Sequence, residues 1–243
     1  MGEAFLWGLI GGSSLVIGGV LAIAFRISLR ALGVVMAFGG GVLVSAVAYE
    51  LVQEAFETSE TLRIVAAGLF AGCAAFAIGD WAIDRMGGEH RKRSSGAQTS
   101  GSGLAIVLGI VLDGIPESAV IGLGLLGGEG VSPAVIVAVF LSNLPEAVAA
   151  TTGLTTAGWP PTRIIGLWVV VALISALASV AGYVLLDGSP PTTIAFVLAF
   201  AGGAILTMLA DTMMPEAYEH GGKVVGVATT LGFALAFAIT SLE

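Results

Sequence analysis

Apolar residues fall along this chain in long uninterrupted runs that are separated by polar breaks. Each run is close to the roughly twenty residues that an α-helix needs to cross the hydrocarbon core of a bilayer. The pattern therefore predicts an all-α integral membrane protein with eight transmembrane helices in a single domain, residues 1–243. The predicted spans are 4–25, 31–53, 62–83, 104–126, 131–155, 163–186, 192–215 and 223–241.

Only one of the polar breaks is long. Residues 84–103 contain the basic run Arg91-Lys92-Arg93, followed by a stretch rich in Ser and Gly, which is typical of a flexible loop. The other breaks include tight turns marked by Gly or Pro. The long break is therefore predicted to be a flexible loop between the third and fourth spans.

Basic residues lie almost entirely on one side of this eight-span topology. Because cytoplasmic loops of membrane proteins are enriched in Lys and Arg, that side is predicted to face the cytoplasm. Both termini are then extracytoplasmic, and the chain is expected to be a multi-pass protein of the cell membrane. The residues on the predicted cytoplasmic side are Arg26, Arg30, Arg85, Arg91, Lys92, Arg93, Arg163 and Lys223, and only Arg63 lies on the other.

The composition narrows the class further. Only 11% of the residues are charged, whereas a soluble domain has about 25%. The formal net charge of −8 argues against nucleic acid as a partner, and the single cysteine, Cys73, excludes an internal disulfide. The N-terminus lacks the basic region of a signal peptide, so the first run is expected to be a retained helix. The 36 glycines suit close helix packing in lipid and are compatible with a homodimer.

Two segments of the chain recur. Asp113-Gly114-Ile115-Pro116-Glu117 is followed by the similar Ser142-Asn143-Leu144-Pro145-Glu146, and both lie inside apolar runs. Residues 37–56 and 199–218, here called the span-2 repeat and the span-7 repeat, share seven identities in an ungapped alignment. In the predicted topology the two members of each pair run in opposite directions, which is typical of transporters built from inverted repeats.

The first pair of segments predicts an ion site. A carboxylate in the middle of a bilayer costs roughly 2.5–3.5 kcal/mol, so buried acidic side chains need a compensating partner, and a cation is a general one. Each proline also frees the carbonyl four residues earlier, at Leu112 or Leu141, from its helical hydrogen bond. We expect a metal site between the fourth and fifth spans, with the ligands Asp113, Glu117, Ser142, Asn143 and Glu146.

Other acidic residues have two readings each. Glu50 and Glu54, near the outer end of the second span, either line an outer vestibule or belong to a hydrated helix end. Asp211 and Glu216, near the cytoplasmic end of the seventh span, either line an exit route or are solvated end charges. The two histidines, His90 and His220, are both predicted to lie in cytoplasmic loops.

With these motifs, the chain resembles the ZIP (Zrt-, Irt-like) family of divalent metal transporters. The family has eight spans, outside termini and Pro-Glu motifs in spans 4 and 5, and the resemblance extends over the whole chain. It implies transport of a divalent cation of the zinc, iron and manganese class into the cytoplasm by alternating access, with spans 1, 4, 5 and 6 moving against spans 2, 3, 7 and 8. The metal is then a substrate, and no cofactor is expected.

This chain departs from the family at the ligands. Asp113 and Ser142 stand where the family usually has imidazole or amide ligands, and no predicted span contains a histidine. An oxygen site for a single ion is therefore expected, which suits Mn²⁺, Fe²⁺ or Mg²⁺ better than Zn²⁺.

Three alternatives to transport follow from the residues. The Pro-Glu motifs either bind an ion or are structural kinks with Glu bonded to a neighbouring helix. A degenerate family member would bind metal as a sensor or scaffold without transporting it. An enzyme is not expected, because the Gly-x-Gly-Asp motif of intramembrane aspartyl proteases fails at its first glycine before Asp80, and a Ser/His intramembrane protease needs a membrane histidine.

Overall fold

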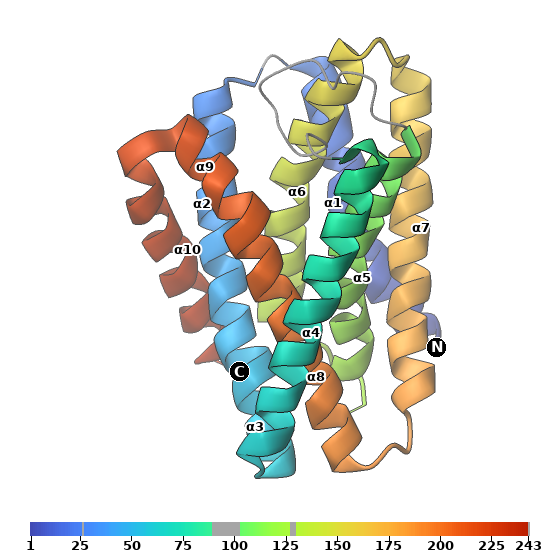
Figure 1. Cartoon of the computed structure of the whole chain (residues 1–243), viewed down its shortest axis with the longest axis vertical. Coiled ribbons are helices and arrows are strands. Elements are labelled where there is room, and N and C mark those ends of the chain that lie inside the picture. The colour runs from blue at the N-terminus through green and yellow to red at the C-terminus, as the bar shows by residue number, and fades with distance from the viewer. Residues whose placement is uncertain (26, 89–102, 127–129, 243) are drawn as a thin grey trace.

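The structure, a computed structural model, describes residues 1–25, 27–88, 103–126 and 130–242. This part of the chain is helical and contains no strand, in agreement with the predicted all-α class. Figure 1 shows the helices packed side by side along one direction. The elements are α1 (Gly2–Ala24), α2 (Leu29–Ala46), η1 (Val47–Gln53), α3 (Glu54–Ser59), α4 (Leu62–Ile83), η2 (Asp84–Gly88), α5 (Gly103–Gly124), α6 (Pro133–Thr156), α7 (Pro161–Leu186), α8 (Pro191–Met208), η3 (Leu209–Met213), α9 (Met214–Gly221), η4 (Gly222–Val224) and α10 (Val225–Thr240).

Six helical segments of the described residues are long and apolar enough to cross a membrane. They have mean hydropathies between 1.7 and 2.6, and the last of them takes in the elements from α8 to α10. The chain is therefore an all-α protein of multi-pass membrane character. The six segments are Gly2–Ala24, Leu29–Ser59, Leu62–Met86, Pro133–Thr156, Pro161–Leu186 and Pro191–Thr240.

Two helices extend well beyond the predicted ends of their spans. The predicted ends at residues 53 and 215 are each six residues short, because the helices continue to Ser59 and Gly221. Polar residues at both places suggested helix ends, but the polar side chains lie on the helix and line cavities. The first residues of the predicted flexible loop, Asp84–Gly88, are helical. Residues 89–102, which include the basic run and His90, lie outside the described residues, and so does Arg26.

The histidine at the end of the seventh segment is not in a loop, contrary to the sequence-based expectation. His220 lies in the last turn of α9, and its side chain is 7% exposed. The helix ends only at Gly222, whose φ of 64° is in the left-handed region that favours glycine. His220 is thus a buried helical side chain.

The span-2 and span-7 repeats have matching secondary structure. In the ungapped alignment, α2 and α8 begin and end at equivalent positions, and each has 18 residues. A π-helix follows in both, η1 with seven residues and η3 with five. π-helical turns are rare and are often found at functional sites. The two repeats therefore share an uncommon backbone feature at the same sequence position.

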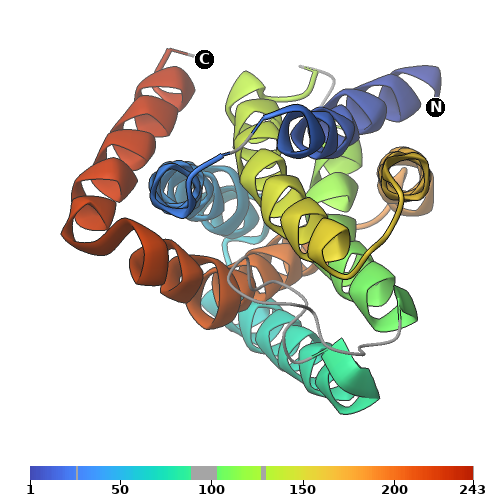
Figure 2. The same ribbon diagram turned by 90° about the horizontal axis from the view of Figure 1, so that it is seen from above.

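The helices pack in two groups. In one, α4 packs against α8, and α2 packs against α10 and α9. In the other, α1 packs against α6 and α7, and α7 also packs against α5. Figure 2 shows the first group around one half of the molecule and the second around the other. The groups meet where α2 contacts α6 and α5 contacts α8.

Glycines allow close backbone contacts within the first group, and these contacts correspond between the repeats. The backbone of Gly72 in α4 lies against the carbonyl of Phe200 in α8, so that an added Cβ would overlap the oxygen. In the same way, Gly232 in α10 lies against the carbonyl of Phe38 in α2. Phe38 and Phe200 are equivalent in the ungapped alignment. The α4–α8 and α10–α2 pairs thus use the same contact.

We predict that Gly72→Ala destabilises the protein by about 1–3 kcal/mol, because the added methyl group can be accommodated only if α4 and α8 move apart. The measurement is thermal unfolding in detergent. Gly166→Ala in α7 is the matched control, since a Cβ there has no atom within 4 Å. Equal losses of stability in the two variants would contradict the close contact.

Candidate metal site

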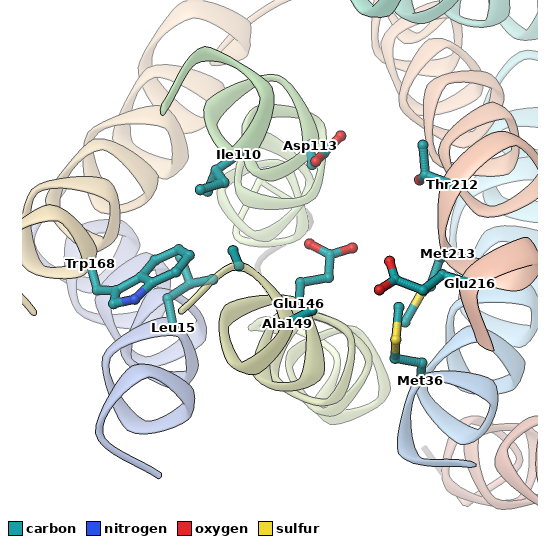
Figure 3. Close-up of a pocket in the computed structure, with 11 residues that line it drawn as sticks. Leu15, Met36, Ile110, Asp113, Glu146, Ala149, Trp168, Thr212, Met213 and Glu216 are labelled. Atoms are coloured by element: carbon teal, nitrogen blue, oxygen red, sulfur yellow. The ribbon is translucent and has the colours of Figure 1, made fainter. Parts of the chain in front are cut away.

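Three carboxylates from two sides of the bundle line one small cavity. Asp113 from α5 and Glu146 from α6 face Glu216 from α9, and Thr212 from η3 completes the polar part of the wall. Figure 3 shows the Glu146 and Glu216 side chains extending into the space between α6 and the helix that carries Glu216. The cavity volume is about 20 Å³, which is enough for about one water molecule. We call it the inner cavity.

The three glutamates of the site follow prolines that lie within helical segments. Pro116 and Pro145 are inside α5 and α6, and both helices continue past them. Pro215 is near the start of α9, directly after the π-helix η3. Proline lacks a backbone N–H and crowds the preceding turn. The third Pro-Glu pair was the sequence signal that could have placed Glu216 beside Glu146.

Glu117 lies one turn from Asp113 and lines a different cavity. The two positions are about 6 Å apart along the axis of α5, and both side chains are at most 3% exposed. The hydroxyl of Ser142 in α6 lies within hydrogen-bond distance of the Glu117 carboxylate, at 3.3 Å from Oε1 and 3.4 Å from Oε2, and of the Val139 carbonyl oxygen at 3.0 Å. Glu117 also lines a cavity of about 20 Å³ with apolar residues of α2, α6 and α8. We call it the middle cavity.

Two other groups of the predicted site, Asn143 and the Leu141 carbonyl, do not line the inner or the middle cavity. Asn143 is buried but lines neither the inner nor the middle cavity. The carbonyl of Leu141, which Pro145 was predicted to free for a metal, lies beside Gly39 of α2, 2.7 Å from where a Cβ would be. The absence of a side chain at Gly39 lets the α2 backbone approach that carbonyl closely.

A large vestibule opens at the end of the bundle that carries both chain termini. It has a volume of about 920 Å³, and Glu50 and Glu54 line one wall together with Glu57. Thr240 of α10 donates a hydrogen bond of 2.7 Å to Glu50 Oε1, which ties η1 to the last helix. Both readings that the sequence left open for Glu50 and Glu54 are compatible with this position, since the two residues line a wide space and Glu54 is exposed.

The vestibule and the two cavities follow one another along α5. Gly124 and Val120 line the vestibule, Val120 and Glu117 line the middle cavity, and Asp113 lines the inner cavity. These residues recur every three or four positions, so they lie on one face of the helix. The same face thus leads from the open end of the bundle to the three carboxylates.

The predicted ligands therefore do not all converge on one point. Asp113 and Glu146 share the inner cavity, whereas Glu117 and Ser142 meet beside the middle one. Within the described residues, no group of three or more His, Cys, Asp or Glu side chains is close enough to hold a metal ion. In this conformation the carboxylates surround a space, and an ion would have to draw them together.

The two acidic residues predicted near the cytoplasmic end differ from each other. Glu216 is 8% exposed and lines the inner cavity, and its Oε1 lies 3.9 Å from Nε2 of His220 one turn later. Asp211, five residues earlier on η3, is exposed and does not line that cavity. Of these two residues, Glu216 alone lines the inner cavity.

Sequence reasoning missed the apolar part of the inner cavity. Leu15, Met36 and Trp168 line it together with Met213, and a single apolar residue in a membrane helix gives no sequence signal for such a position. Trp168 and Thr151 are fully buried, and the indole Nε1 of Trp168 donates a hydrogen bond of 2.8 Å to the Thr151 hydroxyl. This bond fixes the side of the cavity formed by α6 and α7.

We predict that Thr151→Val destabilises the protein by about 1–3 kcal/mol, because it leaves the buried indole N–H without its acceptor. Thr151→Ser keeps the hydroxyl and is the matched control. The measurement is the midpoint of thermal unfolding in detergent, followed by tryptophan fluorescence. A valine variant as stable as the serine variant would show that the bond does not hold Trp168 in place.

The comparisons with known proteins do not add a family. The chain matches no protein-family model and no curated protein. The functional interpretation therefore depends on the residues that line the vestibule and the two cavities.

Proposed function

We propose that this chain is a membrane transporter for a divalent metal cation, similar to the ZIP transporters. The observation that carries the proposal is the inner cavity, where Asp113, Glu146 and Glu216 line a space of about 20 Å³ inside an apolar helix bundle. The cation is the substrate, and no resident cofactor is part of the proposal.

A cation fits the inner cavity for two physical reasons. Carboxylates within a membrane are costly, typically face the bundle interior and mark ion pathways. The available space admits about one water molecule, so a cation that enters must exchange most of its hydration shell for protein oxygens. Carboxylate and hydroxyl oxygens are suitable replacements, and Thr212 adds a hydroxyl to the three carboxylates.

The vestibule suggests the route. Glu50, Glu54 and Glu57 would attract a cation to the wide end of the bundle. From there the face of α5 leads past Glu117 to Asp113. We propose movement in this direction, into the cytoplasm, by alternating access. The inner cavity is formed by both helix groups, Asp113 and Glu146 belonging to one and Glu216 to the other, so a relative movement of the groups would open and close the route.

The route requires a defined topology, which is also a proposal. We propose eight membrane crossings, in which α2 with η1 and α3, and α8 with η3 and α9, each form one span. The connections between α1 and α2, α6 and α7, and α9 and α10 lie together at the end of the bundle opposite the termini (Figure 1). Arg30, Arg163 and Lys223 lie at or near these connections. By the enrichment of basic residues in cytoplasmic loops, this end would face the cytoplasm and both termini would be extracytoplasmic. The matching π-helices and glycine contacts support two halves related by inversion.

We predict that the reconstituted protein carries Mn²⁺ or Zn²⁺ into liposomes and that Glu146→Gln and Glu216→Gln each lower the uptake rate by about tenfold or more, which corresponds to about 1.4 kcal/mol. Each substitution removes a negative charge from the inner cavity. The measurement is uptake followed by a metal-sensitive dye inside the liposomes.

Glu219→Gln is the matched control for that experiment. Glu219 lies three residues after Glu216 on the same helix and is exposed, so uptake should remain at the wild-type rate. Specific binding of metal without any uptake would favour the alternative of a sensor or scaffold. Uptake that survives both cavity variants would refute the proposed route.

The eight-span topology can be tested by labelling two single-cysteine variants, each made in a protein that also carries Cys73→Ser. Asp187→Cys, in the turn between α7 and α8, should react with a membrane-impermeant maleimide on intact cells. Ala157→Cys, between α6 and α7, should react only after the membrane is permeabilised. Both positions are exposed, so equal labelling on intact cells would contradict the eight-span topology.

A further inference from the structure

The inner cavity contains sulfur as well as oxygen. Met36 of α2 and Met213 of η3 line it, together with Asp113, Glu146 and Glu216. Both methionines are 2% exposed. Figure 3 shows their side chains next to that of Glu216, on the side of the cavity opposite Glu146. Two thioethers from different helices therefore lie beside the same carboxylate.

The position of these methionines is not explained by burial alone. Met208, on the same long helix as Met213, is 1% exposed but does not line the inner cavity. All three methionines belong to the same hydrophobic core, so what distinguishes Met36 and Met213 is that they also line the inner cavity. Met36 and Met213 thus pack in the core and also face the carboxylates, whereas Met208 packs in the core without facing them.

Thioethers change which cations a carboxylate cavity prefers. Carboxylate and hydroxyl oxygens are hard ligands that suit Mg²⁺, Ca²⁺ and Mn²⁺, whereas thioether sulfur is a soft ligand. A soft or borderline cation gains from contact with sulfur, and a hard cation does not. Methionine is also flexible, so its sulfur can move toward an ion without displacing the helix.

We infer that Met36 and Met213 make the inner cavity selective for soft and borderline divalent cations, such as Cd²⁺ and Zn²⁺, over hard ones such as Mn²⁺ and Mg²⁺. This inference rests on the proposed function and specifies its substrate class. It also revises the oxygen-only site that the sequence indicated. The sulfur atoms take the place of the imidazole nitrogens as the softer ligands of the site.

The test compares two cations in the same liposomes. The double variant Met36→Leu and Met213→Leu keeps the size and apolar character of both side chains but removes the sulfur. The ratio of Cd²⁺ uptake to Mn²⁺ uptake is expected to fall by about tenfold relative to wild type. Met208→Leu is the matched control and should leave the ratio unchanged. An equal ratio in the double variant and in wild type would overturn the inference.

A second measurement does not depend on transport. Cd²⁺ bound to the purified wild-type protein should show sulfur in its coordination shell by X-ray absorption spectroscopy, and the single variants Met36→Leu and Met213→Leu should each weaken that signal. A shell of oxygen alone in wild type would overturn the inference even if the double variant fails to fold. Metal uptake with an oxygen-only shell would support the proposed function and refute the inference about the methionines. A sulfur shell without uptake would support the inference about the methionines and refute transport.

Discussion

The structure depends on the placement of buried carboxylates within an apolar helix bundle. Asp113, Glu117 and Glu216 are all nearly inaccessible, and in a membrane their charge must be balanced by partners inside the protein. The arrangement meets this requirement by directing them toward other polar groups, as in the contact of Ser142 with Glu117. The inner cavity lies where the polar side chains of several helices meet.

The helix packing provides the space in which this happens. Within each group, glycines bring backbones into direct contact, as Gly72 does with Phe200 and Gly232 does with Phe38. Between the groups the contacts are mixed. Gly39 of α2 lets the backbone approach the Leu141 carbonyl of α6, whereas larger side chains such as Met36 and Met213 line the inner cavity. The π-helices η1 and η3 lie at the vestibule and at the inner cavity, respectively.

Much of the fold could be predicted because it depends on local patterns. The apolar segments follow from run length, and each is helical in the described part of the chain. The predicted ends failed where polar residues continued a helix, as at Glu54 and Glu216, because hydropathy cannot distinguish a helix end from a polar helix face. The paired Pro-Glu motifs indicated α5 and α6 as site helices. Glu216, which follows Pro215, was predicted to lie at the end of its span, either on an exit route or as a solvated end charge.

The sequence by itself determined which segments are helical, which residues carry charge into them and where the repeats lie, because these follow from composition and spacing along the chain. Only the tertiary structure decided that Glu146 faces Glu216, that Glu117 lines a separate cavity, that the Leu141 carbonyl packs against Gly39 and that Met36 lies beside the carboxylates. These relations join residues far apart in the chain. They depend on how the helices rotate and pack, which no local pattern specifies.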